Sequence, residues 1–185
     1  TLNEEKYLPQ VLREIKKQHF DGLEIIVADA NSDDRTVEIA KSFNCRVVKG
    51  GSPAKGRNEG AKVAQGEILL FMDADNIFLP ENFLEDLIGE FERRKLDVAS
   101  FPIYPAGNWI DKVAYGIYNS WVGLTQKFLA YATNSVLVRK TVFEKVNGFD
   151  EEVKIAEDED FAKRAARVGK FGFIRTRPVL TSPRR

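Results

Sequence analysis

Two aspartates that directly follow a short apolar run are the first sign of chemistry in this chain. Residues 68–72 read as a buried strand, and Asp73 and Asp75 come immediately after it. Two carboxylates at the carboxyl end of a strand can share the space above a sheet where α/β proteins bind ligands. Because converging carboxylates repel each other, a divalent cation and a phosphate-bearing ligand would stabilise them. An ordinary polar turn after a strand gives the same pattern, so the rest of the chain must decide.

Other charged residues occupy comparable positions. Asp29 follows the apolar run 23–28, which is also predicted to be a strand. Lys55 and Arg57 lie in the first turn of a helix predicted over residues 54–64, where free backbone N–H groups and the helix dipole favour an anion. These residues indicate a site for an anionic ligand near the ends of the strands.

The second half of the chain contains an aromatic stretch and an acidic cluster. Residues 108–132 include Trp109 and Trp121 and are predicted to form an amphipathic helix. Its aromatic face fits a core-packed helix as well as a sugar-stacking or membrane-facing surface. The four acidic residues 157–160 open a helix predicted over residues 157–168, where carboxylates are favourable to the helix dipole whatever their function.

Composition limits the classes of protein to consider. With 185 residues, 43% of them hydrophobic, the chain can bury one substantial core. Lys and Arg together number 28, as do Asp and Glu, so no overall charge would attract nucleic acid. The single cysteine, Cys45, excludes a disulfide within the chain and is expected in the core, with a reactive thiol as the minor alternative. The single histidine, His19, is assigned to structure.

Strands and helices are predicted to alternate up to residue 105. This alternation favours an α/β domain with a mostly parallel sheet and helices on both faces. The predicted strands are 23–28, 45–48, 68–72, 97–103 and 134–139, and the predicted helices are 3–18, 35–43, 54–64, 81–93, 108–132, 141–146 and 157–168. The sequence has no run of 18 or more apolar residues.

Four blocks, taken in order, resemble the family 2 glycosyltransferases, which are inverting nucleotide-sugar enzymes of the GT-A fold. Thr-Leu-Asn-Glu-Glu at 1–5 is similar to the family's first loop, which follows a strand expected to be missing here. The other blocks are Val-Ala-Asp-Ala-Asn-Ser-Asp-Asp at 27–34, Lys-Gly-Arg-Asn-Glu-Gly at 55–60 with Asp-Ala-Asp at 73–75, and Asn-Gly-Phe-Asp at 147–150 with Glu-Asp-Glu-Asp-Phe at 157–161.

The resemblance implies a single GT-A domain, with a Rossmann-like, mostly parallel central sheet flanked by helices and a smaller acceptor-side subregion. Residues 1–105 would be the nucleotide-sugar-binding half and residues 106–185 the half that binds the acceptor and carries the catalytic base, Asp158. Asp75, assisted by Asp73, would hold Mn²⁺ or Mg²⁺ on the diphosphate. The residues implied to bind the donor are Thr1, Glu4, Asp29, Lys55, Arg57, Asp73 and Arg184, and those implied on the acceptor side are Glu157, Trp109 and Trp121.

Departures from the family pattern refine these expectations. No histidine follows Asp75, so metal binding would depend on the donor, and the Q-x-x-R-W motif of processive synthases is absent, which favours transfer of a single sugar. A UDP-sugar and GDP-mannose both suit an Asp-and-Arg pocket, and the acceptor would be a sugar or a lipid-linked molecule. The resemblance implies a cytoplasmic catalytic part, with membrane association expected through segments outside this sequence, such as a C-terminal extension.

Two alternatives remain on the sequence alone, and a third is set aside. A sugar-phosphate nucleotidyltransferase uses a related sheet and carboxylate pair, but it opens with a Gly-rich basic loop that has no candidate here. A noncatalytic nucleotide-sugar-binding module would keep the carboxylates without turnover. A dehalogenase-like phosphatase also uses D-x-D but needs a following threonine, and Asn76 and Ile77 stand there instead.

Overall fold

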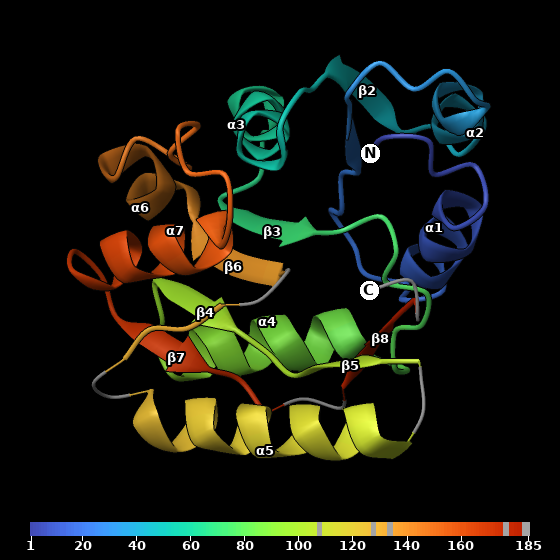
Figure 1. Cartoon of the computed structure of the whole chain (residues 1–185). Helices are drawn as coiled ribbons and strands as arrows, with labels where there is room; N and C mark the ends of the chain where they lie inside the picture. Colours follow the sequence, from blue (N-terminus) through green and yellow to red (C-terminus); the bar gives the residue numbers. More distant parts are fainter. Residues whose placement is uncertain (107–108, 127–128, 133–134, 176–177, 183–185) are drawn as a thin grey trace.

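A four-stranded mixed sheet in the order β3-β6-β4-β7 lies at the centre of the computed structural model (Figure 1). The structure describes residues 1–106, 109–126, 129–132, 135–175 and 178–182. Strand β6 runs antiparallel to both β3 and β4, and β7 is parallel to β4. The strands of this sheet are β3 (Ile68–Met72), β6 (Ser135–Arg139), β4 (Val98–Ser100) and β7 (Phe171–Phe173).

Two parallel strand pairs accompany this sheet. The first is β1 (Ile26–Asp29) with β2 (Arg46–Lys49), and the second is β5 (Ile103–Pro105) with β8 (Val179–Thr181). The helices are α1 (Leu8–Lys16), α2 (Thr36–Ser42), α3 (Pro53–Val63), α4 (Phe83–Arg93), α5 (Trp109–Thr125), α6 (Lys140–Lys145) and α7 (Glu157–Ala166). Three of the five described pairings between these strands are parallel, so the prediction of an α/β domain rich in parallel strands is confirmed.

Several predicted boundaries differ from the structure. The single strand predicted over residues 97–103 is two strands, because Pro102 has no N–H for a ladder and the chain leaves β6 to pair with β8. The helix predicted from residue 3 begins at Leu8, and the helix predicted to residue 132 ends at Thr125. Strands β7 and β8 were not predicted, because three residues show no readable period.

A cluster of phenylalanines joins the central sheet to the helices that follow it. The ring of Phe149 stacks on Phe161 of α7 with centroids 4.3 Å apart, and it meets Phe71 of β3 edge-on at 5.0 Å. Phe143 of α6 lies 5.7 Å from Phe161. Because aromatic contacts of this kind have defined geometry, the cluster fixes where α7 begins relative to the end of β3.

The remaining single residues agree with the sequence interpretation. Cys45 is buried against α1, α2 and β1, and burial raises the pKa of its thiol, as expected for a core cysteine. His19 is exposed just beyond α1. In the part of the chain that the structure describes, no helix is long and apolar enough to cross a bilayer.

Replacing Phe161 by alanine should lower the free energy of unfolding by about 3–5 kcal/mol, because a fully buried ring is removed from the phenylalanine cluster. Urea denaturation followed by circular dichroism measures the change. Phe78→Ala is the control, since its ring is 47% exposed, and should cost less than about 0.5 kcal/mol. Equal losses in the two variants would show that the cluster does not hold α7 in place.

Candidate active site

The first turn of α7 presents a carboxylate to the interior. The buried residues of this helix recur at helical spacing, and they are Asp158, Phe161, Ala162 and Ala165. Asp158 is therefore on the core-facing stripe and only 6% exposed, whereas its neighbour Glu159 pairs with Lys163 on the outer surface. Ala156, just before the helix, has a positive φ of 59°, which is strained for a residue with a side chain. A strained entry that leads to a buried carboxylate is typical of a functional site.

The guanidinium of Arg57, in the first half of α3, connects this turn to the end of β3. Its Nη1 lies 2.7 Å from Glu157 Oε1 and 3.2 Å from Asp158 Oδ1, and its Nη2 lies 3.0 Å from Asp73 Oδ1. The Arg57 side chain is only 12% exposed. Burial alone would lower the pKa of Arg57, but Asp158, Asp73 and Glu157 outweigh it and raise the pKa, so the charge is permanent.

A second contact between α3 and the segment before α7 sits beside the first. The Asn58 side chain donates to the Phe149 carbonyl at 2.9 Å and accepts from the Phe149 N–H at 2.8 Å. The preceding residue, Gly148, has a φ of +68°, and a Cβ there would lie 2.5 Å from Asn58 Oδ1. Only glycine therefore fits this close approach without strain.

The D-x-D residues differ in their surroundings. Asp73 pairs with Arg57, while Asp75 is 2% exposed and lies beside β8, where Ser182 N–H donates to its carbonyl at 2.9 Å and Ser182 Oγ lies 3.4 Å from Oδ2. Carboxylate oxygens suit Mg²⁺ or Mn²⁺, which commonly bind one or two carboxylates together with substrate phosphates. Among the described residues, no group of three or more acidic, His or Cys side chains could hold a metal alone. The pair can contribute two carboxylates to the coordination of such a cation.

Asp29, at the end of β1, is held by a set of short hydrogen bonds. Its Oδ1 accepts from Ser32 Oγ at 2.6 Å and from Thr1 Oγ1 at 3.0 Å, and its Oδ2 accepts from the Ser32 N–H at 2.9 Å. Burial alone would raise the pKa of Asp29, but the hydrogen bonds from Ser32 and Thr1 outweigh it and lower the pKa. Glu4, also buried, anchors the neighbouring loop through its N–H, which donates to Thr36 Oγ1 at 2.8 Å.

The other predicted residues lie farther out. Lys55 is exposed at the start of α3. Trp109 and Trp121 lie on α5, 73% and 42% exposed, and α5 runs along the bottom of Figure 1 while α3 is at the top. Their acceptor-side role stays a prediction. Arg184 lies outside the described residues.

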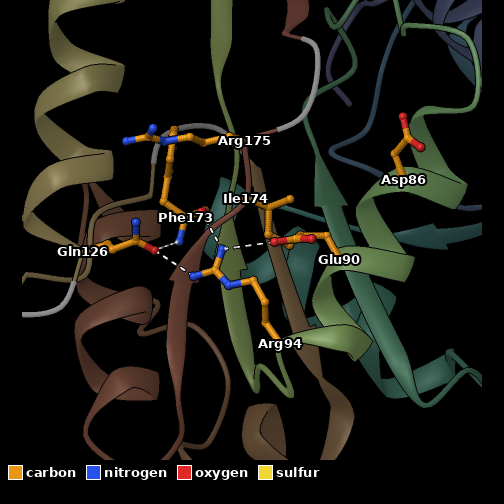
Figure 2. A pocket seen from close by; sticks show the side chains of 7 residues that line it. All are labelled: Asp86, Glu90, Arg94, Gln126, Phe173, Ile174 and Arg175. Atoms are coloured by element: carbon orange, nitrogen blue, oxygen red, sulfur yellow. Dashed lines mark hydrogen bonds and ion pairs between the residues drawn. The ribbon is translucent and has the colours of Figure 1, made fainter.

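Two surface pockets avoid the carboxylate cluster. One, of about 540 Å³, lies between α4 and the segment after β7, where Arg94 pairs with Glu90 and donates to the Phe173 carbonyl and to Gln126 (Figure 2). The other, of about 530 Å³, is lined by the loops 3–7 and 33–34, close to Asp29 in sequence. Neither is lined by Asp73, Asp75 or Asp158.

Sequence reasoning missed three residues that support the site. Ser32 holds Asp29, Asn58 clamps the Phe149 backbone, and Ser182 lies against Asp75. Ser32 and Asn58 both fall inside blocks that carried the resemblance. Ser182 had no signal of its own, because its position depends on β8 returning to the sheet edge.

The architecture is that of the GT-A glycosyltransferase domains. It superposes on the crystal structure of residues 1–349 of TarS from Staphylococcus aureus in complex with UDP-GlcNAc, with a TM-score of 0.80, 24% identity and coverage of 100% of this chain and 57% of that one. A mannosyltransferase from Pyrobaculum calidifontis, solved with GDP-Man and Mn²⁺, gives a TM-score of 0.77 at 20% identity, with coverage of 98% and 54%.

Residues 1–146 match the pattern of glycosyl transferase family 2, and the chain belongs to this family. Among curated relatives, it is 29% identical over 178 residues to the poly(ribitol-phosphate) β-N-acetylglucosaminyltransferase TarS of Staphylococcus aureus, which covers 89% of this chain and 31% of the relative. The chain thus spans about a third of that protein's length. The GT-A fold and the family expected from the sequence are confirmed.

Replacing Ser32 by alanine should raise the pKa of Asp29, because the largest stabilising contacts of the ionised carboxylate include the Ser32 hydroxyl. A depressed carboxyl pKa stabilises the fold above the unfolded-state pKa, and this stability is lost as pH falls through the folded-state pKa. The variant should therefore lose about 1 kcal/mol at neutral pH and progressively less in acid.

Carbon-13 NMR titration of Asp29 and urea denaturation at several pH values measure the two effects. Ser42→Ala is the control, since the exposed Ser42 hydroxyl donates to the Ile39 carbonyl within its own helix, α2. If the pKa of Asp29 is unchanged in Ser32→Ala, the hydrogen bonds from Ser32 are not what lowers it.

Proposed function

We propose that this chain is the catalytic part of a metal-dependent inverting glycosyltransferase that moves a single sugar from a UDP-sugar to an acceptor hydroxyl. The observation that carries the proposal is the position of Asp158: a buried carboxylate at the start of α7, joined through Arg57 to the D-x-D residue Asp73. A general base must reach the acceptor hydroxyl that attacks the anomeric carbon from the side opposite the leaving group. The connection through Arg57 supports a site in which Asp158 and the D-x-D pair act on the two sides of one carbon.

The likeness to TarS supports a UDP-sugar donor, because that relative is an N-acetylglucosaminyltransferase and its structure was solved with UDP-GlcNAc. GDP-mannose is the competing donor, supported by the mannosyltransferase structure. Asp29, with its lowered pKa, is ionised at neutral pH and can accept hydrogen bonds from the N–H groups of a nucleotide base.

In the proposed reaction, Asp158 accepts the proton of the acceptor hydroxyl as the acceptor oxygen attacks the anomeric carbon. The bond between that carbon and the diphosphate oxygen breaks, its electron pair leaves with the nucleoside diphosphate, and the configuration inverts. Asp73 and Asp75 would hold Mn²⁺ or Mg²⁺, which would neutralise charge on the diphosphate. Arg57 Nη1, 3.2 Å from Asp158 Oδ1, would hold this carboxylate in place for the proton transfer.

The halves of the chain carry different parts of this proposal. Residues 1–105 contribute Asp29, Arg57 and the D-x-D pair, and residues 106–185 contribute Glu157 and Asp158. We place the acceptor on the side of α7, with Trp109 and Trp121 as acceptor contacts, and a sugar or lipid-linked molecule as the acceptor. A cytoplasmic location, at a membrane face, belongs to the same proposal.

Asp158→Asn should reduce transfer by about 10²–10⁴-fold, because amide nitrogen and oxygen cannot take the acceptor proton. Donor affinity should stay close to that of the unmodified chain. Initial rates of sugar transfer and calorimetric titration with UDP-sugar measure the two quantities. The matched control is Glu159→Gln in the same turn, whose carboxylate pairs outward with Lys163 and whose loss should leave the rate unchanged. An equal loss of rate and affinity in Asp158→Asn would count against a base.

Thermal-shift measurements with UDP-sugars and GDP-mannose, each with and without Mn²⁺, should show the largest stabilisation for a UDP-sugar with Mn²⁺. A ligand at a hundredfold excess over its dissociation constant adds about 2.7 kcal/mol of apparent stability. Asp75→Asn should remove the increment due to Mn²⁺, whereas Asp86→Asn, on α4, should not. A shift that is the same with and without Mn²⁺ would exclude metal-dependent donor binding. No shift with any donor, together with no turnover, would favour a module that binds something else.

A further inference from the structure

The contacts of Arg57 go beyond what binding a nucleotide would require. Its two terminal nitrogens contact carboxylates from two different elements, Asp73 after β3 and the first turn of α7. Nη2 also lies 3.4 Å from Asp158 Oδ2, so both oxygens of Asp158 face the same guanidinium. A planar guanidinium fork that meets both oxygens of a carboxylate fixes the orientation of that carboxylate as well as its distance.

The charges explain why this position needs an arginine. Asp73, Glu157 and Asp158 would bring three negative charges together, and each of them is partly or fully buried. Like charges at such distances repel each other and push the groups apart. One buried guanidinium offsets part of this repulsion.

The Arg57 side chain has a defined platform as well. Its guanidinium lies over the Phe149 ring, 5.2 Å from the centroid, and that ring belongs to the phenylalanine cluster that supports α7. The next residue, Asn58, holds the Phe149 backbone by two hydrogen bonds. Arg57 therefore contacts the side chain of Phe149, and Asn58 holds its main chain. Together the two contacts restrict the movement of the ion-pair network.

We infer that Arg57 is a positioning residue that sets the place and orientation of Asp158 relative to the D-x-D pair. This inference rests on the proposed function, because it concerns the geometry of the transfer step. In-line displacement requires the base and the departing diphosphate on opposite sides of one carbon, and a misplacement of about 1 Å can cost on the order of a hundredfold in rate. Arg57 contacts both Asp158 and the D-x-D residue Asp73 directly.

The experiment compares Arg57→Gln and Arg57→Lys with Arg139→Gln. Arg139 is a matched control, because it also pairs with carboxylates, Glu92 and Asp97, and also lies over a phenylalanine, Phe91, but at the far end of β6. Three quantities are measured: the kcat of transfer, the Kd of the UDP-sugar, and hydrogen exchange in the peptide 157–162, where the Asp160 N–H donates to Ala156.

A positioning role gives a particular combination of results. In Arg57→Gln, kcat should fall by about a hundredfold and exchange at the start of α7 should accelerate by about tenfold, while the donor Kd changes by less than about threefold. Arg57→Lys should recover only part of kcat, because an ammonium keeps the charge without the fork. It also provides the test if the glutamine variant does not fold. Arg139→Gln should match the unmodified chain in all three measurements.

Other combinations overturn the inference. A donor Kd that rises in proportion to the loss of kcat/KM, with unchanged kcat and exchange, would make Arg57 a nucleotide contact. Full activity in Arg57→Lys would reduce its role to charge. If the unmodified chain transfers no sugar from any donor, the proposed function fails, and the exchange measurement still decides separately whether Arg57 holds the first turn of α7.

Discussion

The structure of this site depends on the buried guanidinium of Arg57, which pairs with carboxylates that are far apart in the sequence. Arg57 and Glu157 are 100 positions apart, and their contact joins α3 to the start of α7. Burying this many charges is costly unless they are paired in good geometry. The fold meets that requirement with a forked donor, a phenylalanine beneath it and a clamped backbone beside it. The site is consequently a product of the whole domain, and the two ends of the network cannot shift independently.

The phenylalanine cluster and the ion-pair network work as one unit. Phe149 stacks on Phe161 below and faces the Arg57 guanidinium above, so apolar packing and charge pairing meet on the same ring. Asp158 lies three residues before Phe161 on the buried stripe of α7. Packing energy from the core thereby fixes a carboxylate that would otherwise prefer water. This is the physical reason why a carboxylate can be held at an interior position of α7.

The two aspartates of the D-x-D pair have different surroundings. Asp73 belongs to the network with Arg57, whereas Asp75 is enclosed beside Ser182 at the edge formed by β8. Asp29, at the end of β1, is ionised by hydrogen bonds from Ser32 and Thr1. Three carboxylates at the ends of two strands, β1 and β3, therefore face different partners, which suits the proposed nucleotide-sugar donor.

The sequence by itself determined the α/β class, the family and the carboxylates at the strand ends, because strand endings, first-turn charges and block order are local properties. It also placed α3, β3 and the start of α7 closely, since each has a clear period or cap. Only the tertiary structure decided that Arg57 joins Asp73 to Asp158, that β6 runs antiparallel between β3 and β4, and that Ser182 returns to Asp75. These contacts join residues that are 16 to 107 positions apart. No local pattern encodes them, because they arise when the packed sheet and the phenylalanine cluster bring separate chain segments to one place.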